Sequence, residues 1–548
     1  MAITKTASPQ NTGGAKVAII AMFFLFAMVA FVTNLAAPIG TIWGYQFEGN
    51  SFLGMLGNMM NFLAYLFMGI PAGKMLARIG YKKTALWAMA IGVVGLFVQW
   101  LSSVIGAEST VYESAVAVKD NIDGMEVTVQ KTFGVTVSFI IYLIGAFICG
   151  FCVCMLNTVV NPMLNLLGGG GNRGNQLIQT GGALNSLAAT LTPFFVGALI
   201  GQLTRYSQMS DVAILLWIAM GIFLCAFIII SFVKIPEPEL AHGAKKKVRH
   251  SHSALSFRHT VLGIVAIFFY VGIEVGIPGT LNFYLSDQKA TGAGVLGDAS
   301  AIAGAVVALY WLLMLVGRTV SGAISGRVST RAQLVSVTGV AIILLGAAIF
   351  ISRENRIAVP KVIYDKEASI TRQLSDAGMP AEGITDFIGN PSSDKVMAYT
   401  VPVTVKATDG QVYTKYVIKD AQGNPSTRQP RDLVSMATSE SGVPVSALLL
   451  VLAGLCTSVM WGNIFNLAVD GLGKYTAQAS GLFMMMVVGG GIIPLLQQLV
   501  ANSSGYMNSY WLLIGALGYI FLYAIWGCIN VNKDIPVGIE DVTQEQLI

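Results

Sequence analysis

Charged side chains are scarce in this chain. They make up 11% of its 548 residues, and hydrophobic side chains make up 54%, whereas an average soluble domain is about 25% charged. This amount of apolar surface is more than the core of a water-soluble protein could bury. Lipid is therefore the expected solvent. The basic residues, which give a formal net charge of +5, lie in short loops and form no basic face, and nucleic acid is therefore not an expected partner.

Motifs for ATP-driven or redox chemistry are also missing. No G-x-x-x-x-G-K-[ST] sequence occurs, so the phosphate cradle of an ATP-driven pump is not expected. All six cysteines lie in apolar stretches, where a thiol usually packs as a small hydrophobe. The four histidines all fall within 242–259. The sequence therefore predicts no enzyme, no cofactor and no metal site, and any transport must run on a gradient.

Twelve apolar stretches are long enough to cross a bilayer, which needs about 20 apolar residues per helix. They predict an all-α membrane protein with twelve transmembrane helices, a number that suits a transporter better than an anchored enzyme. The stretches are 16–43, 52–73, 84–106, 135–166, 176–203, 212–233, 260–286, 300–324, 333–352, 444–470, 477–500 and 508–530.

Basic residues in short loops predict the orientation of these spans, because cytoplasmic loops are enriched in Lys and Arg. Lys74 and Arg78 follow the second span and Arg327 follows the eighth. We therefore expect an inner-membrane protein with both termini in the cytoplasm. We also expect it to act as a monomer. The predicted parts are a first six-helix bundle (1–233), a cytoplasmic central loop (234–259), a second six-helix bundle (260–352 and 443–530), a periplasmic insertion (353–442) and a cytoplasmic tail (531–548).

The insertion is the one soluble piece of the predicted architecture. Alternating valines precede Asp409 and Gly410, a dipeptide typical of tight turns, so we expect a β-hairpin there. Residues 370–388 are consistent with one or two short helices. A cap over the outer face and a sugar-binding module are both open interpretations.

Glu274 lies in the middle of the seventh span. A carboxylate cannot face lipid at that depth, so it must face a cavity or a partner. Coupling to a proton or cation, a bond to a substrate hydroxyl, and a structural hydrogen bond between helices are the alternatives. Charges nearer the span ends can snorkel to the interface, and we expect them to act as gates or loop anchors: Lys74, Arg78, Arg318, Arg327 and Asp470.

Neutral amides within the spans form a second set of candidates. An amide both donates and accepts hydrogen bonds, which suits a neutral polyhydroxylated ligand, and flat aromatic rings suit the stacking of sugar rings. A single amide is more often a helix–helix contact, so the inference depends on their number. The predicted substrate-binding residues are Asn34, Asn157, Asn161, Gln179, Asn185, Asn282, Tyr310, Trp311, Trp461, Asn463 and Asn466.

Several short motifs together resemble the fucose–galactose–glucose branch of proton symporters in the major facilitator superfamily. The resemblance covers nearly all of the helical sequence and implies a two-bundle fold, a central cavity open alternately to either side, and uptake of a monosaccharide. The motifs are Asn161-Pro162 with Leu167-Gly168, Tyr270-Val271-Gly272 with Glu274, Tyr310-Trp311 with Gly317-Arg318, Ser458 to Trp461, and Gly489-Gly490 with Pro494.

The chain departs from that family at positions that matter for coupling. Asn34 and Asn157 stand where the family's two proton-binding carboxylates are expected, and amides cannot titrate. Gln179 and Asn185 are three residues further apart than the family motif requires, so we expect only one of them at a sugar contact.

Import of a neutral hexose or deoxyhexose by a secondary transporter is the leading hypothesis, with a proton or sodium ion coupled through Glu274. A nucleoside transporter, a facilitator and a drug exporter of the same fold are alternatives. A membrane sensor is a further alternative, although the sequence lacks a sizeable cytoplasmic output module.

Overall fold

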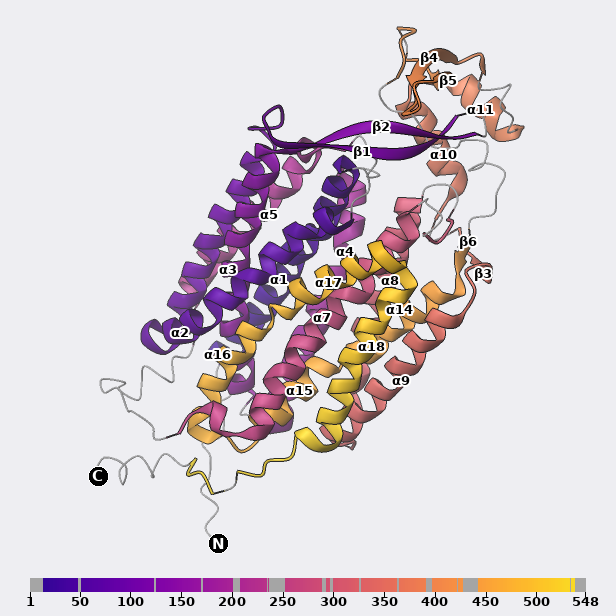
Figure 1. Cartoon of the computed structure of the whole chain (residues 1–548). Coiled ribbons are helices and arrows are strands. Elements are labelled where there is room, and N and C mark those ends of the chain that lie inside the picture. Colours follow the sequence, from indigo (N-terminus) through magenta and orange to yellow (C-terminus); the bar gives the residue numbers. More distant parts are fainter. Residues whose placement is uncertain are drawn as a thin grey trace.

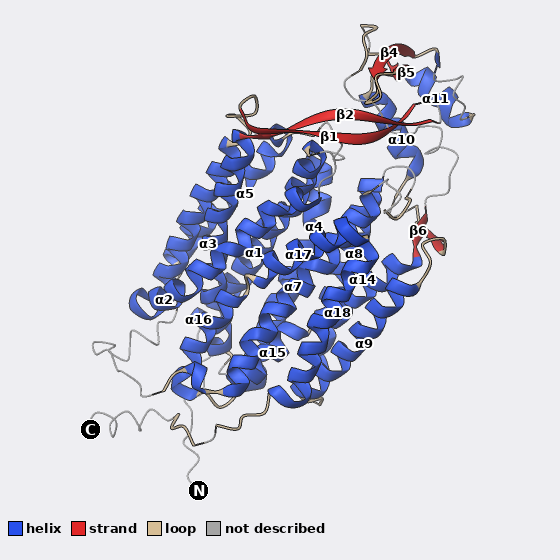
Figure 2. Ribbon diagram, viewed as in Figure 1, coloured by secondary structure: helices blue, strands red, loops and turns tan. Residues whose placement is uncertain are grey.

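Helices make up most of the described chain (Figures 1 and 2). The computed structural model describes residues 13–47, 51–122, 125–168, 171–200, 207–233, 235, 252–287, 292–295, 299–324, 327–361, 364–390, 397–420, 422–426, 442–532 and 534–537. Most of the predicted central loop (236–251) and of the predicted tail (538–548) therefore lies outside the described residues.

The first half of the fold contains five described helices, of which the second carries two spans. Residue Gly80 is the non-helical point between these spans, with φ 84° and ψ 174°, a backbone conformation that side chains with a Cβ rarely adopt. The helices are α1 (Gly13–Gln46), α2 (Ser51–Leu101), α3 (Val137–Leu167), α4 (Gly171–Ile200) and α5 (Ala213–Phe232).

The second half is built from α7 to α9 and α14 to α18. The predicted spans 444–470 and 477–500 are each broken into two helices, at Ser458–Val459 and at Val487–Val488. The last span continues beyond α18 as a π-helical turn, Tyr523–Gly527. The helices are α7 (Arg258–Ser286), α8 (Ala299–Ile324), α9 (Thr330–Phe350), α14 (Val445–Thr457), α15 (Met460–Val469), α16 (Thr476–Met486), α17 (Gly489–Ser504) and α18 (Tyr506–Leu522).

Eleven spans within the described chain are long and apolar enough to cross a membrane. Helix α4, which packs against α1 and α8, is the twelfth, so the expected twelve-helix architecture is confirmed. The two halves meet along two seams, where α4 packs on α8 and where α2 packs on α16 and α17.

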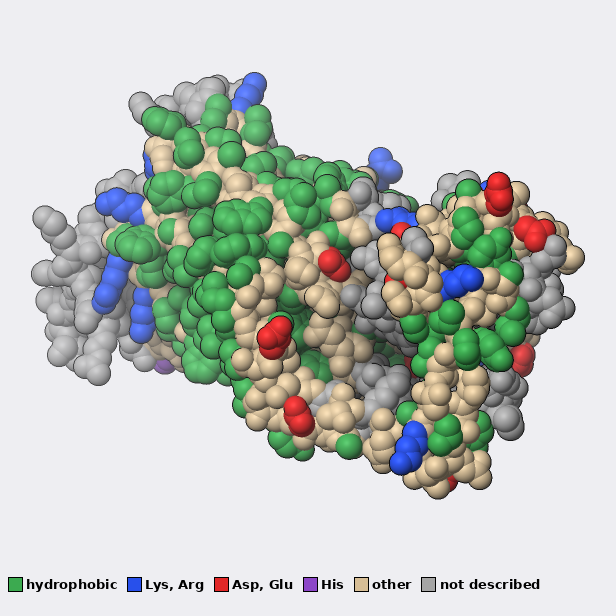
Figure 3. Space-filling model, turned by 90° about the horizontal axis from the view of Figure 1, so that it is seen from above, with side chains coloured by type: hydrophobic (Ala, Val, Ile, Leu, Met, Phe, Trp, Pro, Cys, Tyr) green, Lys and Arg blue, Asp and Glu red, His purple; other side chains and the backbone are tan. Residues whose placement is uncertain are grey.

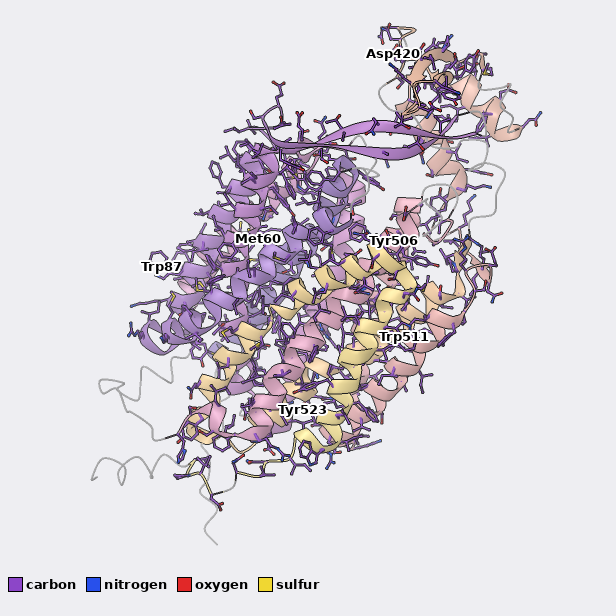
Figure 4. The ribbon with its side chains drawn as sticks, viewed as in Figure 1. Met60, Trp87, Asp420, Tyr506, Trp511 and Tyr523 are labelled. Carbon is purple, nitrogen blue, oxygen red and sulfur yellow. The ribbon has the colours of Figure 1, made fainter. Side chains whose placement is uncertain are left out.

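The outer surface of the bundle is apolar. Trp87 on α2 and Trp511 on α18 are 59% and 50% exposed, and both lie on the periphery of the helices (Figure 4). Hydrophobic side chains cover much of the described helical body, whereas acidic and basic side chains are scattered over the part of the chain beside it that contains residues 366–418 (Figure 3). This distribution suits a body surrounded by lipid.

Two antiparallel hairpins and a short strand pair add the β structure. The predicted hairpin is confirmed as β4 (Thr400–Lys406) with β5 (Val412–Ile418), and Gly410 lies in its turn. The short helices are confirmed as α10 (Lys366–Asp376) and α11 (Ala381–Gly389). We call α10, α11, β4 and β5 the lobe. Strands β3 (Arg356–Ala358) and β6 (Gly442–Pro444) pair where the chain leaves and re-enters the helical body.

The second hairpin was not expected from the sequence. Strands β1 (Thr110–Ile122) and β2 (Met125–Thr136) pair between the third and fourth spans. This hairpin lies across one end of the first half and reaches the lobe (Figure 1).

Candidate functional site

A cavity of about 610 Å³ lies between the two halves, within the ~300–1,000 Å³ range of small-molecule sites. Its wall is contributed by α1 to α4 of the first half and by α7, α8, α15 and α16 of the second. On α1 the lining runs from Phe26 to Thr41, and on α7 it runs from Tyr270 to Phe283. These are the parts of α1 and α7 nearer the end of the bundle that carries the β1–β2 hairpin.

The structure brings most of the predicted substrate-binding residues to this one cavity. Six of the predicted amides and both predicted tryptophans line it: Asn34, Asn157, Asn161, Gln179, Asn185, Asn282, Trp311 and Trp461. The wall therefore offers donors, acceptors and flat rings together, the combination expected for a polyhydroxylated ligand.

Hydrogen bonds hold the amides of α3 in place. Asn157 Nδ2 donates to the Tyr65 hydroxyl at 2.8 Å, and Asn161 Nδ2 donates to the carbonyl of Asn157 at 3.0 Å. On α1, Asn34 Nδ2 donates to the carbonyl of Ala30 at 2.8 Å. Side chains fixed in this way are oriented before a ligand enters, which reduces the entropy cost of binding.

Both amides of α4 line the cavity, although the sequence analysis expected only one of them to do so. The three-residue spacing of Gln179, Gly182 and Asn185 keeps all three within one side of the helix. Gln179 is 6% exposed, and its Nε2 has no hydrogen-bond partner among the described residues. A buried donor without a partner is costly, so a ligand oxygen is a fitting acceptor for it.

Tyr310, Asn463 and Asn466 are not among the described lining residues. The Tyr310 hydroxyl is hydrogen-bonded with Thr457 Oγ1 at 2.9 Å and donates to the carbonyl of Glu274 at 3.3 Å, so it ties α8 to α14 and α7. Asn463 is buried inside the second half. Direct contact of these three with a substrate stays a prediction.

Glu274 and Arg318 form an ion pair within the cavity. Arg318 Nη2 lies 3.0 Å from Glu274 Oε1, and the two side chains are 10% and 16% exposed, respectively. Arg318 Nη1 also donates to the carbonyl of Gly182 at 2.6 Å and to Ser186 Oγ at 2.9 Å, while its Nε donates to the carbonyl of Ser458 at 3.3 Å. One guanidinium therefore links α7, α8, the α14–α15 break and, across the seam, α4.

This geometry corrects the interpretation of Arg318 as a snorkelling residue. Its side chain is directed inward to Glu274 and is not extended towards an interface. By contrast Lys74, Arg78, Arg327 and Asp470 are exposed and absent from the described cavity wall. Their role as gates stays a prediction.

Sequence reasoning missed several lining residues. Tyr65, which accepts from Asn157, had no signal beyond being one tyrosine in an apolar span. Tyr270 lies one turn before Glu274 on the same side of α7, and its place in the family motif was the available signal. Asn58 belongs to the set of neutral amides in the spans but was not among the predicted substrate-binding residues. It lines the cavity and donates through Nδ2 to the carbonyl of Gly490 at 3.2 Å, across the α2–α17 seam.

Comparison with known proteins identifies relatives along the whole chain. A glucose/galactose transporter of Brucella abortus (strain 2308) is 25% identical over 533 residues, covering 96% of both chains. A putative glucose/galactose transporter of Helicobacter pylori (strain J99) is 24% identical over 523 residues, covering 92% of this chain and 95% of that one.

Solved structures share the fold. A crystal structure of the E. coli fucose:proton symporter FucP aligns with a TM-score of 0.57 and 16% identity, covering 93% of this chain and 99% of that chain. A structure of FucP in the outward conformation aligns with a TM-score of 0.55 and 15% identity, with the same coverage.

The model of the Major Facilitator Superfamily matches residues 18–359, more than half of the chain. Together with the two helical halves and the cavity between them, this match shows that the chain belongs to the major facilitator superfamily of membrane transporters.

Proposed function

We propose that this protein imports a neutral hexose or deoxyhexose across the inner membrane by alternating access. The observation that carries the proposal is the cavity between the halves, in which six of the predicted amides and two tryptophans meet. The names of the relatives, glucose/galactose transporters over nearly their full length and a fucose:proton symporter in fold, support the same substrate class.

A cation gradient drives accumulation in this proposal, and Glu274 is the coupling residue. It is the one carboxylate among the described lining residues. Asn34 and Asn157 also line the cavity, but their amides cannot titrate and so cannot carry a coupling proton. Protonation of Glu274 removes the negative charge that holds Arg318 Nη2, and the same guanidinium holds α4 through Gly182 and Ser186. A proton at Glu274 thereby removes one of the contacts that position the guanidinium bridging the two halves, and in this proposal that change links proton binding to the rocking motion.

The proposed orientation places both termini in the cytoplasm, with the β1–β2 hairpin and the lobe on the other side. The basic residues Lys74, Arg78 and Arg327 support this orientation. They are exposed and lie towards the opposite end of the bundle, the first two near the Gly80 turn of α2 and the third just after α8. The cavity lining on α1 and α7 then extends towards the outside.

A facilitator is the second candidate, because the two amides replace the carboxylates that the resembled family uses for coupling. Uptake into membrane vesicles separates the two functions. A panel of labelled monosaccharides is offered under an imposed proton gradient, then a sodium gradient, then neither. A symporter accumulates its sugar only with its own gradient, and a facilitator equilibrates it in all three conditions.

The coupling role is tested with Glu274→Gln. We expect accumulation against a gradient to be lost and sugar exchange at equilibrium to persist, because a glutamine neither gains nor loses a proton. Glu382→Gln, an exposed acid of α11, is the matched control and should behave as the wild type. Undiminished accumulation by Glu274→Gln would exclude the coupling role.

A further inference from the structure

We propose that the Glu274–Arg318 pair also determines substrate charge, because in the state that receives the sugar, with Glu274 ionised, it keeps the cavity electrically neutral and so restricts it to uncharged sugars. The inference rests on the proposed function and deepens it. Glu274 and Arg318 are the two charged side chains among the described residues of the wall, and their charges cancel at 3.0 Å.

Every nitrogen of the guanidinium already has a partner. Its Nη2 faces Glu274, its Nη1 is shared by the carbonyl of Gly182 and Ser186 Oγ, and its Nε donates to the carbonyl of Ser458. These contacts use four of its five N–H groups, so an anionic sugar that entered would find only the second N–H of Nη2, beside Glu274. It would also bring a second negative charge close to Glu274.

Such charges interact strongly in a site walled by low-dielectric protein and lipid. A hexuronate or a protonated amino sugar therefore finds no net opposite charge that would offset the cost of taking its own charge out of water. A neutral hexose meets neither penalty and finds the amides of α1, α3 and α4. Selection against wrong partners by unfavourable charge is a general source of specificity.

Removing one charge should change the preference in a direction set by the charge that remains. Glu274→Gln leaves an unopposed guanidinium and should admit a hexuronate. Arg318→Gln leaves an unopposed carboxylate and should admit a protonated amino sugar. Glu274→Asp, and the double variant with Gln at both positions, keep the cavity neutral and should retain the wild-type preference.

Exchange in proteoliposomes measures these preferences without a driving gradient. Efflux of preloaded labelled hexose is competed from outside with glucose, glucuronate or glucosamine, below neutral pH so that the amine is protonated. Relative to glucose, we expect glucuronate to compete at least about tenfold better in Glu274→Gln than in the wild type, and glucosamine correspondingly better in Arg318→Gln, as expected for a charge freed in a desolvated site.

Equal competition by glucuronate and glucose in the wild type would overturn the inference, as would preferences unchanged in both single variants. An unpaired buried charge can prevent folding, so ligand-induced shifts in the thermal unfolding of the purified wild type and double variant are measured as well. Only the neutral sugar should shift either midpoint. A failure of the proposed function itself would give a different result. The wild type would then exchange no neutral sugar of the panel, and none of these sugars would raise its unfolding midpoint.

Discussion

The backbone N–H of Thr408 and its hydroxyl both donate to the carbonyl of Thr128, at 2.8 and 3.0 Å. Thr128 belongs to β2, in the insertion of the first half, and Thr408 lies in the turn of the lobe that the second half carries. Val127 and Ala407 are buried against each other beside this contact. The two halves are thus joined outside the helices, at the end towards which the cavity extends.

A disulfide at this contact should slow transport. In the proposed cycle the halves change their relative tilt, so joining Thr128→Cys to Thr408→Cys opposes that change. We expect oxidation to reduce the initial rate of sugar uptake severalfold and a reductant to restore it. Each single cysteine serves as a control, in a background with Cys225→Ser because Cys225 is the exposed native thiol among the described residues. Full uptake by a completely cross-linked protein would show that the hairpin and the lobe need not separate.

Loss of the Asn157 side chain should weaken sugar binding. Asn157→Ala removes an amide from the cavity wall together with its 2.8 Å hydrogen bond to Tyr65. One polar contact is worth about 1 kcal/mol, so we expect the KM for uptake to rise roughly five- to tenfold at an unchanged expression level. Asn508→Ala on α18, an exposed amide that donates to the carbonyl of Ser504 at the end of α17, should leave the KM as it is.

Gly69 permits a close approach of the two halves. A Cβ at this position would lie 2.7 Å from the backbone nitrogen of Met485 on α16, and forced overpacking costs about 1–3 kcal/mol. We expect Gly69→Ala to lower both the unfolding midpoint and the uptake rate. Gly221→Ala is the matched control, because a Cβ there meets nothing within 4 Å. Equal behaviour of the two variants would mean that α2 and α16 are not closely packed.

The lobe has a hydrophobic cluster of its own, separate from the main core, and Phe387 is fully buried in it. Phe387→Ala should destabilise the lobe by about 3–5 kcal/mol, which is a large share of the stability of so small a unit. Limited proteolysis should then cleave within 364–426, while the helical bundle keeps its unfolding midpoint. Val412→Ala, at an exposed position of β5, should remain as resistant as the wild type.

Spans that lie in lipid could be located from the sequence because their composition is set by the solvent. The predicted span 260–286 corresponds to α7 at Arg258–Ser286. The breaks at Ser458 and Val487 could not be located in this way, since hydropathy is continuous across both points. At the second break the backbone hydrogen bonds only shift from the i−4 to the i−3 carbonyl. The Gly489-Gly490 pair beside the second break was the available signal.

Two failures have different causes. The β1–β2 hairpin was missed although alternating valines and the Asp123-Gly124 dipeptide between the strands are typical of one. The position of Arg318 was misjudged because it lies only six residues before the end of α8 at Ile324, about 9 Å along a helix. At that depth a long side chain can extend either to the membrane interface or into the cavity. Arg318 extends into the cavity because Glu274, Gly182 and Ser186, which are distant in sequence, bind its guanidinium there.

The turn at Gly80 has a mechanical consequence. Only this one residue leaves helical geometry between two spans of α2. No flexible loop separates the two spans, so we expect them to move together. One arm carries Asn58 and Tyr65 on the cavity wall, and the other ends at Leu101, shortly before β1 begins at Thr110. We therefore expect a shift of the arm that lines the cavity to move the arm that leads to the β1–β2 hairpin.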